Sequence, residues 1–338
     1  MSERRSIDYI PESERHGHPF SQFTLWFGGN LQITAIVTGA LAVVLGGDVV
    51  WSLVGLLVGQ MLGAAVMSLH ALQGPRLGLP QMILSRAQFG VFGAVVPLVL
   101  VCVMYIGFSA SGTVLGTQTS MTLGVLTAAI AGSAFPGHEV SYLVGLGKSQ
   151  AMAMVIYFAI CFGKITFTTL NAYGSFMSLT TIVSAFRRQT VLSQKCRIAF
   201  VVLMVTASCI IALLSEPAFL KHFTHFLLFL LAFFVPWSAI CLTDYYLISK
   251  GAIDIPALSD PQQRYGFWNL YAITLYIVGV LIQLPFIENP LFHGSLTWIF
   301  AGNDVSWIIG WFGTGVLYYA LRRFDRRSLP AQSLFPST

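Results

Sequence analysis

The chain carries Trp26-Phe27-Gly28-Gly29-Asn30-Leu31-Gln32 inside its first long apolar run, residues 20–46. Two adjacent glycines loosen a helix, because each costs ~1 kcal/mol relative to alanine. Asn30 and Gln32 then place two amides where hydrocarbon excludes unpaired polar groups. A membrane span that is both broken and polar is typical of a transporter with its ligand or ion site at mid-membrane.

Composition points to the same class of protein. Of 338 residues, 56% are hydrophobic and only 9% are charged, whereas soluble domains carry about 25% charged residues. We therefore expect an all-α polytopic membrane protein. The net charge of +5 needs no nucleic-acid partner, because the basic residues cluster in loops, where they set membrane orientation.

No enzyme signature stands out, and a Walker A loop is absent, which argues against an ATP-driven pump. The five cysteines have no paired spacing and are interpreted as packing residues: Cys102, Cys161, Cys196, Cys209 and Cys241. His222 and His225 are too few, and too close to a loop, for haem or a catalytic metal. We expect no cofactor and no metal beyond a coupling Na⁺.

A helix needs ~20 apolar residues to cross the hydrocarbon core. By that rule the chain has nine candidate spans: 20–46, 49–72, 89–112, 118–136, 150–186, 197–214, 222–248, 267–287 and 304–321. The fifth, with 37 residues, must be tilted, broken or extended beyond the bilayer. The Pro/Gly-rich segment 74–88 is interpreted as a basic loop. We divide the chain into a cytoplasmic N-terminal segment (1–19), one transmembrane transporter domain (20–321) and a cytoplasmic tail (322–338).

The positive-inside rule places most Lys and Arg residues in the cytoplasm, but two stretches of the chain then conflict. Arg86 is inside, and two candidate spans follow it, which returns the loop 136–148 to the inside. The fifth span must nevertheless begin outside if it is to end inside at Arg187. Either 89–136 holds one true span plus a re-entrant piece, or an odd number of spans is missing.

Several short motifs are distributed along the chain. They begin with Asp8-Tyr9-Ile10-Pro11, Glu14-Arg15-His16-Gly17, Gln22-Phe23, Trp26-Phe27 and Asn30. They continue with Thr38-Gly39-Ala40, Met104-Tyr105-Ile106-Gly107-Phe108, Leu170-Asn171-Ala172-Tyr173-Gly174-Ser175, Pro236-Trp237-Ser238 and Thr243-Asp244-Tyr245-Tyr246. Together these motifs resemble the purine–cytosine permeases of nucleobase:cation symporter family 1, from about residue 8 to about residue 325.

The resemblance implies a five-plus-five inverted-repeat (LeuT-like) fold of about twelve spans, shortened here to about nine. The chain resembles spans one to three and seven to twelve, so that spans four to six are missing and the junction falls near 116–119. An odd number of missing spans agrees with the conflict found from charge. The missing sixth span supplies an aromatic part of the substrate site in the family.

Substrate contacts are expected from amides and aromatic rings. A carboxamide offers one donor group and one acceptor, which suits the edge of a nucleobase, and aromatic rings stack on planar bases at ~1–3 kcal/mol per base. The predicted substrate-binding residues are Gln32, Asn30, Asn171, Tyr105, Phe108 and Ser109. The alternative is that these amides and rings serve only in packing between helices.

A cation site is expected beside them. Unwound carbonyls at Gly28 and Leu31 could bind a cation, and the resemblance places a sodium-binding hydroxyl at Thr166. Thr168, Thr169 and Lys164 complete the predicted set. Lys164 either contributes the positive charge and favours proton coupling, or reaches an aqueous surface. The threonines could instead bond to their own helix carbonyls.

Pro236, Trp237 and Asp244 are the predicted gating residues, because a proline frees a carbonyl and permits bending. Asp244 has capping or pairing as its alternative role. The predicted function is uptake of cytosine or a purine by alternating access, coupled to H⁺ or Na⁺, in a bacterial inner (plasma) membrane. The alternatives are a transport-inactive shortened variant, or a partner of a full-length copy, and more weakly a membrane sensor or channel.

Overall fold

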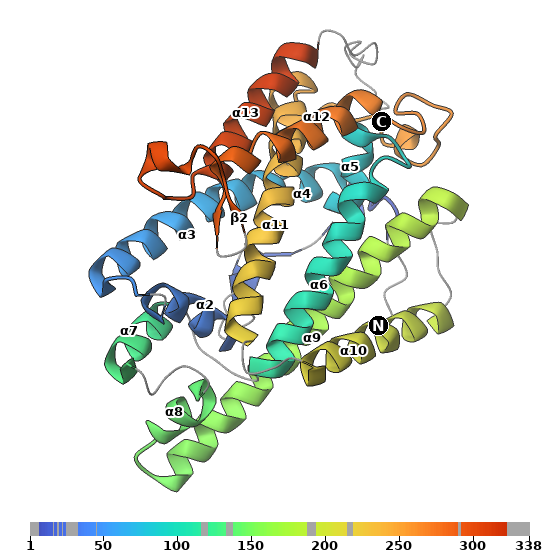
Figure 1. The fold of residues 1–338 in the computed structure, drawn as a ribbon. Coiled ribbons are helices and arrows are strands. Elements are labelled where there is room, and N and C mark those ends of the chain that lie inside the picture. The colour runs from blue at the N-terminus through green and yellow to red at the C-terminus, as the bar shows by residue number, and fades with distance from the viewer. Residues whose placement is uncertain are drawn as a thin grey trace.

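The computed structural model describes residues 7–15, 17–18, 20–21, 23–24, 33–44, 46–115, 121–132, 138–187, 194–214, 219–289 and 292–322. At 33–37, 110–115, 121–125, 139–140, 159–167, 194, 212–214 and 219–221 the description covers the backbone only. Within these ranges the chain is helical apart from loops and one small β-hairpin (Figure 1). The all-α expectation is confirmed.

The longer helices follow the expected spans closely. They are α2 (Ile33–Val44), α3 (Val49–Ala71), α6 (Val95–Leu115), α7 (Met121–Ala131), α9 (Gln150–Arg187), α10 (Gln194–Leu214), α11 (Phe219–Leu242), α12 (Leu270–Leu281) and α13 (Ser306–Leu321). Shorter elements connect them: η1 (Glu12–Glu14), α4 (Gln73–Leu77), α5 (Gln81–Phe89), α8 (Glu139–Gly145), the π-helix η3 (Thr243–Ile248), η4 (Pro256–Leu258), η5 (Leu284–Phe286), η6 (Thr297–Phe300), and strands β1 (Glu288–Asn289) and β2 (Phe292–His293).

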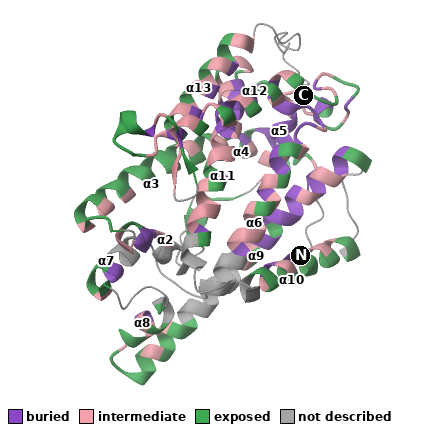
Figure 2. Ribbon diagram, in the orientation of Figure 1, coloured by how far each residue is buried: buried purple, intermediate pink, exposed green. Residues whose placement is uncertain are grey.

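Helix α3 shows how the sequence produces a lipid-facing span. The Asp48 carboxylate caps it by accepting hydrogen bonds from the N–H groups of Val50 and Trp51, at 3.0 and 3.1 Å. No residue of α3 is buried, and Figure 2 shows it exposed along its length. A helix that is apolar all round and unburied suits a hydrocarbon environment. Within the described residues, Val49–Leu77 and His222–Ile248 are long and apolar enough to cross a membrane.

The segment 74–88 departs from the sequence expectation, because it folds into α4 and α5 and not into a loop. Gly78 ends α4 in the left-handed region (φ 65°), and Pro80 precedes the first residue of α5. The glycine and the proline therefore mark the ends of two short helices. Helix α5 buries both apolar and polar side chains, among them Leu84 and Arg86.

The N-terminal strap, residues 7–15, is fastened to this segment. The Ile10 N–H donates to the Gly78 carbonyl at 2.9 Å. The Arg15 guanidinium donates to the Ile10 carbonyl and to the carbonyls of residues 75–76, at 2.9 to 3.1 Å. Ile7 is buried in a cluster with side chains of α4, α5, α9 and η4. The strap is therefore part of the core at this end of the bundle.

Several segments that each carry Lys or Arg residues meet at this same end, which we call the basic end and define by residues 7–15, 73–90, 181–187, 243–266 and 322. Arg86 is buried and donates to the carbonyls of Leu258 and Thr181 and to the Ser184 hydroxyl, at 2.7 to 3.1 Å. Burial lowers the pKa of Arg86 to about 10, so it remains charged at neutral pH. The expectation that these basic segments share one side of the membrane fits this arrangement.

Two helices bear on the conflict over the crossings between Arg86 and the fifth span. Helix α9 is one continuous helix of 38 residues ending at the basic end, so its first residue lies at the opposite end. Helix α6 runs from the basic end along α9 (Figure 1). Of the span expected at 118–136, the structure describes 121–132, which include α7; the other residues of that span lie outside the described residues, so the number of crossings there stays a prediction.

Candidate functional site

Part of the predicted site lies outside the described residues. Gly28, Asn30, Leu31 and Gln32 fall there entirely. The backbones of Lys164 and Thr166 belong to α9, but their side chains are outside the description. The predicted site residues whose side chains the structure describes therefore lie in α6, α9, α11 and η3.

Asn171 lies in the buried half of α9. Its side chain is 5% exposed, and its Nδ2 has no hydrogen-bond partner among the described residues. The Ser175 hydroxyl, one turn further along, is also buried and lacks a partner there. A buried donor without a hydrogen-bond partner costs ~1–3 kcal/mol. Each of these two groups is therefore suited to a ligand that supplies a hydrogen-bond acceptor.

Tyr105 of α6 faces this turn of α9. A Cβ atom added to Gly174 would lie 2.5 Å from the Tyr105 hydroxyl and would overlap its ring, so glycine is what allows the ring to lie there. Gly174 follows Asn171 by three residues, which places them on one face of α9. Ser109 is buried one turn after Tyr105 in α6. Helical spacing therefore places Ser109 on the face of α6 that carries Tyr105, and Asn171 on the face of α9 that Tyr105 contacts at Gly174.

Other predicted residues have different surroundings. The Phe108 ring packs edge-on against Phe223 and Phe226 of α11, with centroids 6.3 and 5.8 Å apart. Thr168 is half-buried and Thr169 is exposed. Phe108 therefore connects α6 to α11, and its predicted stacking on a base is a separate role that these contacts leave untested.

Pro236 lies inside α11 at the level of α12 and α13. A Cβ on Gly279 of α12 would lie 2.8 Å from the Pro236 Cβ, so the two helices approach closely. Beside them, the Gln283 amide donates to the Ala232 carbonyl at 2.9 Å. Sequence reasoning missed Gln283; the available signal was a lone amide near the end of the apolar run 267–287, 14 residues after Asn269 at its start.

The residues after Pro236 contact α3. The His70 ring stacks on Trp237 with centroids 5.3 Å apart and planes within 1°. Its Nε2 is 2.6 Å from the Ser238 hydroxyl. Sequence reasoning missed His70 as well, although it is the one imidazole in the run 49–72. Trp237 thus joins the predicted gating segment to the lipid-facing helix.

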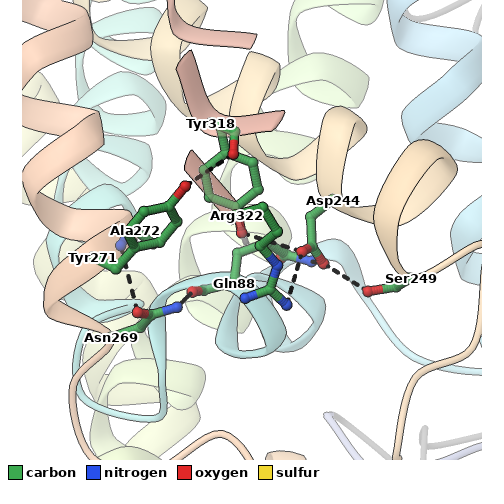
Figure 3. Close-up of polar contacts among 8 residues, drawn as sticks. All are labelled: Gln88, Asp244, Ser249, Asn269, Tyr271, Ala272, Tyr318 and Arg322. Carbon is green, nitrogen blue, oxygen red and sulfur yellow. Dashed lines mark hydrogen bonds and ion pairs between the residues drawn. The ribbon is translucent and has the colours of Figure 1, made fainter. Parts of the chain in front are cut away.

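Asp244 is buried at the centre of a polar cluster at the basic end (Figure 3). Its Oδ2 accepts hydrogen bonds from Gln88 Nε2 (3.1 Å) and Ser249 Oγ (3.0 Å). Its Oδ1 accepts one from the Tyr318 hydroxyl (3.1 Å) and lies 3.5 Å from an Arg322 nitrogen. The pairing considered from the sequence is present, and the gating role remains a prediction.

The same cluster fixes the neighbouring helix ends. The Asn269 amide donates to the Gln88 carbonyl at 2.6 Å, and its oxygen accepts the N–H of Ala272 at the start of α12. The Tyr271 hydroxyl donates to the Tyr318 carbonyl at 2.9 Å. The cluster therefore ties α5, η3, α12 and α13 into one unit beneath the candidate site.

The arrangement can bind a small polar molecule. Within the described residues no group of three or more His, Cys, Asp or Glu side chains could hold a metal ion. None of the four described cysteines, Cys102, Cys196, Cys209 and Cys241, forms a disulfide within the described residues. Buried amide and hydroxyl groups beside an aromatic ring can hold a small planar polar molecule.

Comparison with known proteins identifies the family. The family model for permeases of cytosine/purines, uracil, thiamine and allantoin matches residues 9–149 and 112–310. A solved structure described as the inward facing conformation of Mhp1 matches with a TM-score of 0.57 and 14% identity, covering 98% of this chain and 96% of that chain. The likeness supports the expected LeuT-like fold.

A relative from Bacillus subtilis (strain 168), YxlA, which is named as a purine-cytosine permease, is 29% identical over 439 residues. The alignment covers 95% of this chain and 96% of the relative. Because 439 exceeds the 338 residues present here by 101, at least that many aligned positions have no counterpart, and they lie internally. The chain therefore belongs to the family of permeases for cytosine and purines, uracil, thiamine and allantoin, as a shortened member that lacks an internal segment.

Proposed function

We propose that the protein imports a nucleobase, cytosine or a purine, across a bacterial plasma membrane by alternating access, coupled to H⁺ or Na⁺. The observation that carries this proposal is the buried Asn171, whose Nδ2 has no hydrogen-bond partner among the described residues, one turn before the Gly174 that Tyr105 packs against. A base edge presents adjacent donors and acceptors, and a carboxamide presents one of each kind. The family membership of the chain and the name of its Bacillus relative support the same substrate class.

The test is uptake of labelled cytosine and hypoxanthine by cells that lack their own nucleobase permeases. They would express the parent chain, Asn171→Ala, or the control Asn303→Ala, which changes an exposed amide in a loop. We expect uptake by the parent and by the control, and a loss of affinity in Asn171→Ala. A lost hydrogen bond of ~1–3 kcal/mol corresponds to about a 5- to 150-fold rise in Kd.

The coupling ion is tested with the same cells. Sodium coupling predicts that removing Na⁺ abolishes uptake and that Thr166→Ala raises the Na⁺ concentration needed. Proton coupling through Lys164 predicts pH-dependent uptake that Lys164→Met abolishes. If Lys164→Met leaves pH-dependent uptake unchanged, the proposal that this lysine takes part in coupling fails.

A transport-inactive variant is the second candidate, and the internal positions missing relative to the Bacillus relative favour it. The family resemblance assigns an aromatic wall of the substrate site to the missing spans. This candidate predicts no uptake at normal membrane levels, and binding only as the partner of a full-length copy. Co-purification with a co-expressed full-length permease, without uptake by the short chain alone, would support it.

Both termini are proposed to be cytoplasmic. The strap contacts the segment 73–90, and Arg322 contacts Asp244, so the described residues nearest both termini lie at the basic end. The Lys and Arg residues gathered there favour the cytoplasmic side. Reporter fusions after residues 145 and 338 should report opposite sides of the membrane, with the second fusion inside. An extracellular C-terminus would contradict this orientation.

A further inference from the structure

The starting point is a carbonyl that Pro236 leaves without its usual donor. In an α-helix the N–H of each residue donates to the carbonyl four positions earlier. Proline has no N–H, so the Ala232 carbonyl cannot receive that bond from residue 236. Helix α11 nevertheless continues on both sides of the proline.

Gln283 of the adjoining segment fills this gap. Its Nε2 donates to the Ala232 carbonyl at 2.9 Å and to the Gly279 carbonyl, also at 2.9 Å. Gly279 lies in the last turn of α12, where carbonyls lose their intrahelical partners. The side chain is 0% exposed. One amide therefore satisfies two carbonyls, one left by the proline and one at a helix end.

The space for this amide is provided by α13. A Cβ on Gly310 would lie 2.6 Å from the Gln283 Oε1 and 2.7 Å from its Cγ. Any other residue at 310 would push the amide away from Ala232. Three helices thus combine to place one donor at the proline.

The two halves of α11 contact different parts of the molecule. Before the proline, Phe223 and Phe226 pack on Phe108 of α6, next to the candidate substrate site. After the proline, Trp237 and Ser238 contact His70 of α3. A change of angle at Pro236 would therefore move the aromatic pair relative to the candidate site.

We propose that Gln283 is a positioning residue for α11, acting at the point where Pro236 interrupts its hydrogen bonds. By bonding the Ala232 carbonyl, it sets the angle between the half that packs on Phe108 and the half that contacts His70. This inference rests on the proposed transport function for its biological meaning. Its physical content, a bond between Gln283 and the proline-freed carbonyl, is measurable without transport.

The first experiment is a double-mutant cycle of thermal unfolding in detergent. Gln283→Met keeps the length of the side chain and removes the donor. In a Pro236→Ala background the alanine N–H can donate to Ala232, so the drop in unfolding midpoint caused by Gln283→Met should fall to half or less. The matched control is Gln88→Met, another buried amide, whose effect should be the same in both backgrounds. Equal drops for Gln283→Met in the two backgrounds would overturn the proposal.

The second experiment measures the angle directly. Spin labels at Phe229 and Leu247, both exposed and about 27 Å apart along a helix at ~1.5 Å per residue, flank the proline in a cysteine-free background. Gln283→Met should shift or broaden their distance distribution, and Asn303→Ala, which changes an exposed loop amide, should leave it unchanged. An unchanged distribution in Gln283→Met would refute a positioning role.

Uptake then connects the bond to transport. If the parent transports, Gln283→Met should lower the maximal rate several-fold while KM changes less than twofold, because the residue does not touch the candidate site. A change confined to KM would contradict the proposal. If the parent does not transport, the proposed function fails, and the unfolding and distance measurements still decide the role of Gln283.

Discussion

Asp244→Asn is the substitution whose effect can be worked out most fully from the structure. The carboxylate is buried, accepts three side-chain hydrogen bonds and lies 3.5 Å from the Arg322 guanidinium. An asparagine of the same shape turns one acceptor into a donor. If that donor replaces Oδ2, it faces the Gln88 amide, which can only donate at this contact; if it replaces Oδ1, it faces Arg322.

The expected cost follows from burial. Removing one member of a buried ion pair costs roughly 3–5 kcal/mol. Arg322 is 13% exposed against 3% for Asp244, so solvent can reach the cation in part, and we expect about 3 kcal/mol. At about 2–4 °C per kcal/mol for large domains, the unfolding midpoint should fall by at least about 6 °C.

The assay is thermal unfolding of the detergent-solubilised protein, with Asp48→Asn as the control. Asp48 caps α3 from an exposed position, and asparagine caps a helix about as well as aspartate. The control should therefore stay within about 1 °C of the parent. Equal midpoints for the two variants would show that Asp244 is not a buried, paired carboxylate, and would refute the reasoning.

Three further predictions concern separate parts of the molecule. Gly174→Ala places a methyl group against the Tyr105 ring; overpacking costs about 1–3 kcal/mol of folding stability, so the thermal unfolding midpoint in detergent should fall, and it should recover in part when Tyr105 is changed to Leu. Gly78→Ala forces alanine into the left-handed region at φ 65° and toward the strap, at about 1–2 kcal/mol, so limited proteolysis should cut residues 7–15 faster than in the parent. The hydrogen bond to His293 lowers the pKa of Glu288. The pair therefore stabilises the hairpin above the ordinary carboxyl pKa of 4.5, and this stabilisation is lost as the pH falls below that value. Glu288→Gln should abolish the acid-induced rise in hydrogen exchange at the hairpin, and an unchanged rise would count against the pair.

Apolar run lengths were enough to predict most of the helices. The runs 49–72 and 150–186 became α3 and α9 almost to the residue, because a span in hydrocarbon must form its backbone hydrogen bonds internally. Missing spans were one of the two explanations considered for the conflict of charge around Arg86, and the alignment with the Bacillus relative leaves at least 101 aligned positions without a counterpart in this chain.

Local pattern could not predict the segment 74–88. Gly78 and Pro80 read as a loop, yet each sits at the end of a short helix. What stabilises those helices is burial of Leu84 and Arg86 against α9 and η4, and such contacts depend on residues about 100 positions or more away in the chain.

The candidate site was predictable to the extent that it rests on single residues. Asn171 and Tyr105 stood out as polar groups in apolar runs, and the structure places them on facing helices. Gln283 did not stand out, because its role depends on a proline 47 positions earlier. No spacing rule connects an amide to a carbonyl in another helix.

The strap has a consequence for the order of events during synthesis. The carbonyls that accept hydrogen bonds from Arg15 lie only about 60 positions further along the chain. These hydrogen bonds can therefore form as soon as α2 and α3 have left the ribosome. The pocket for Ile7 also needs Phe176, Tyr245 and Leu258, the last made some 250 residues later. At roughly 5–20 residues per second, Ile7 stays uncovered for about 10–50 s. Its burial would then mark a chain whose later helices have arrived, and a truncated product would leave that isoleucine exposed to the cell's proteases.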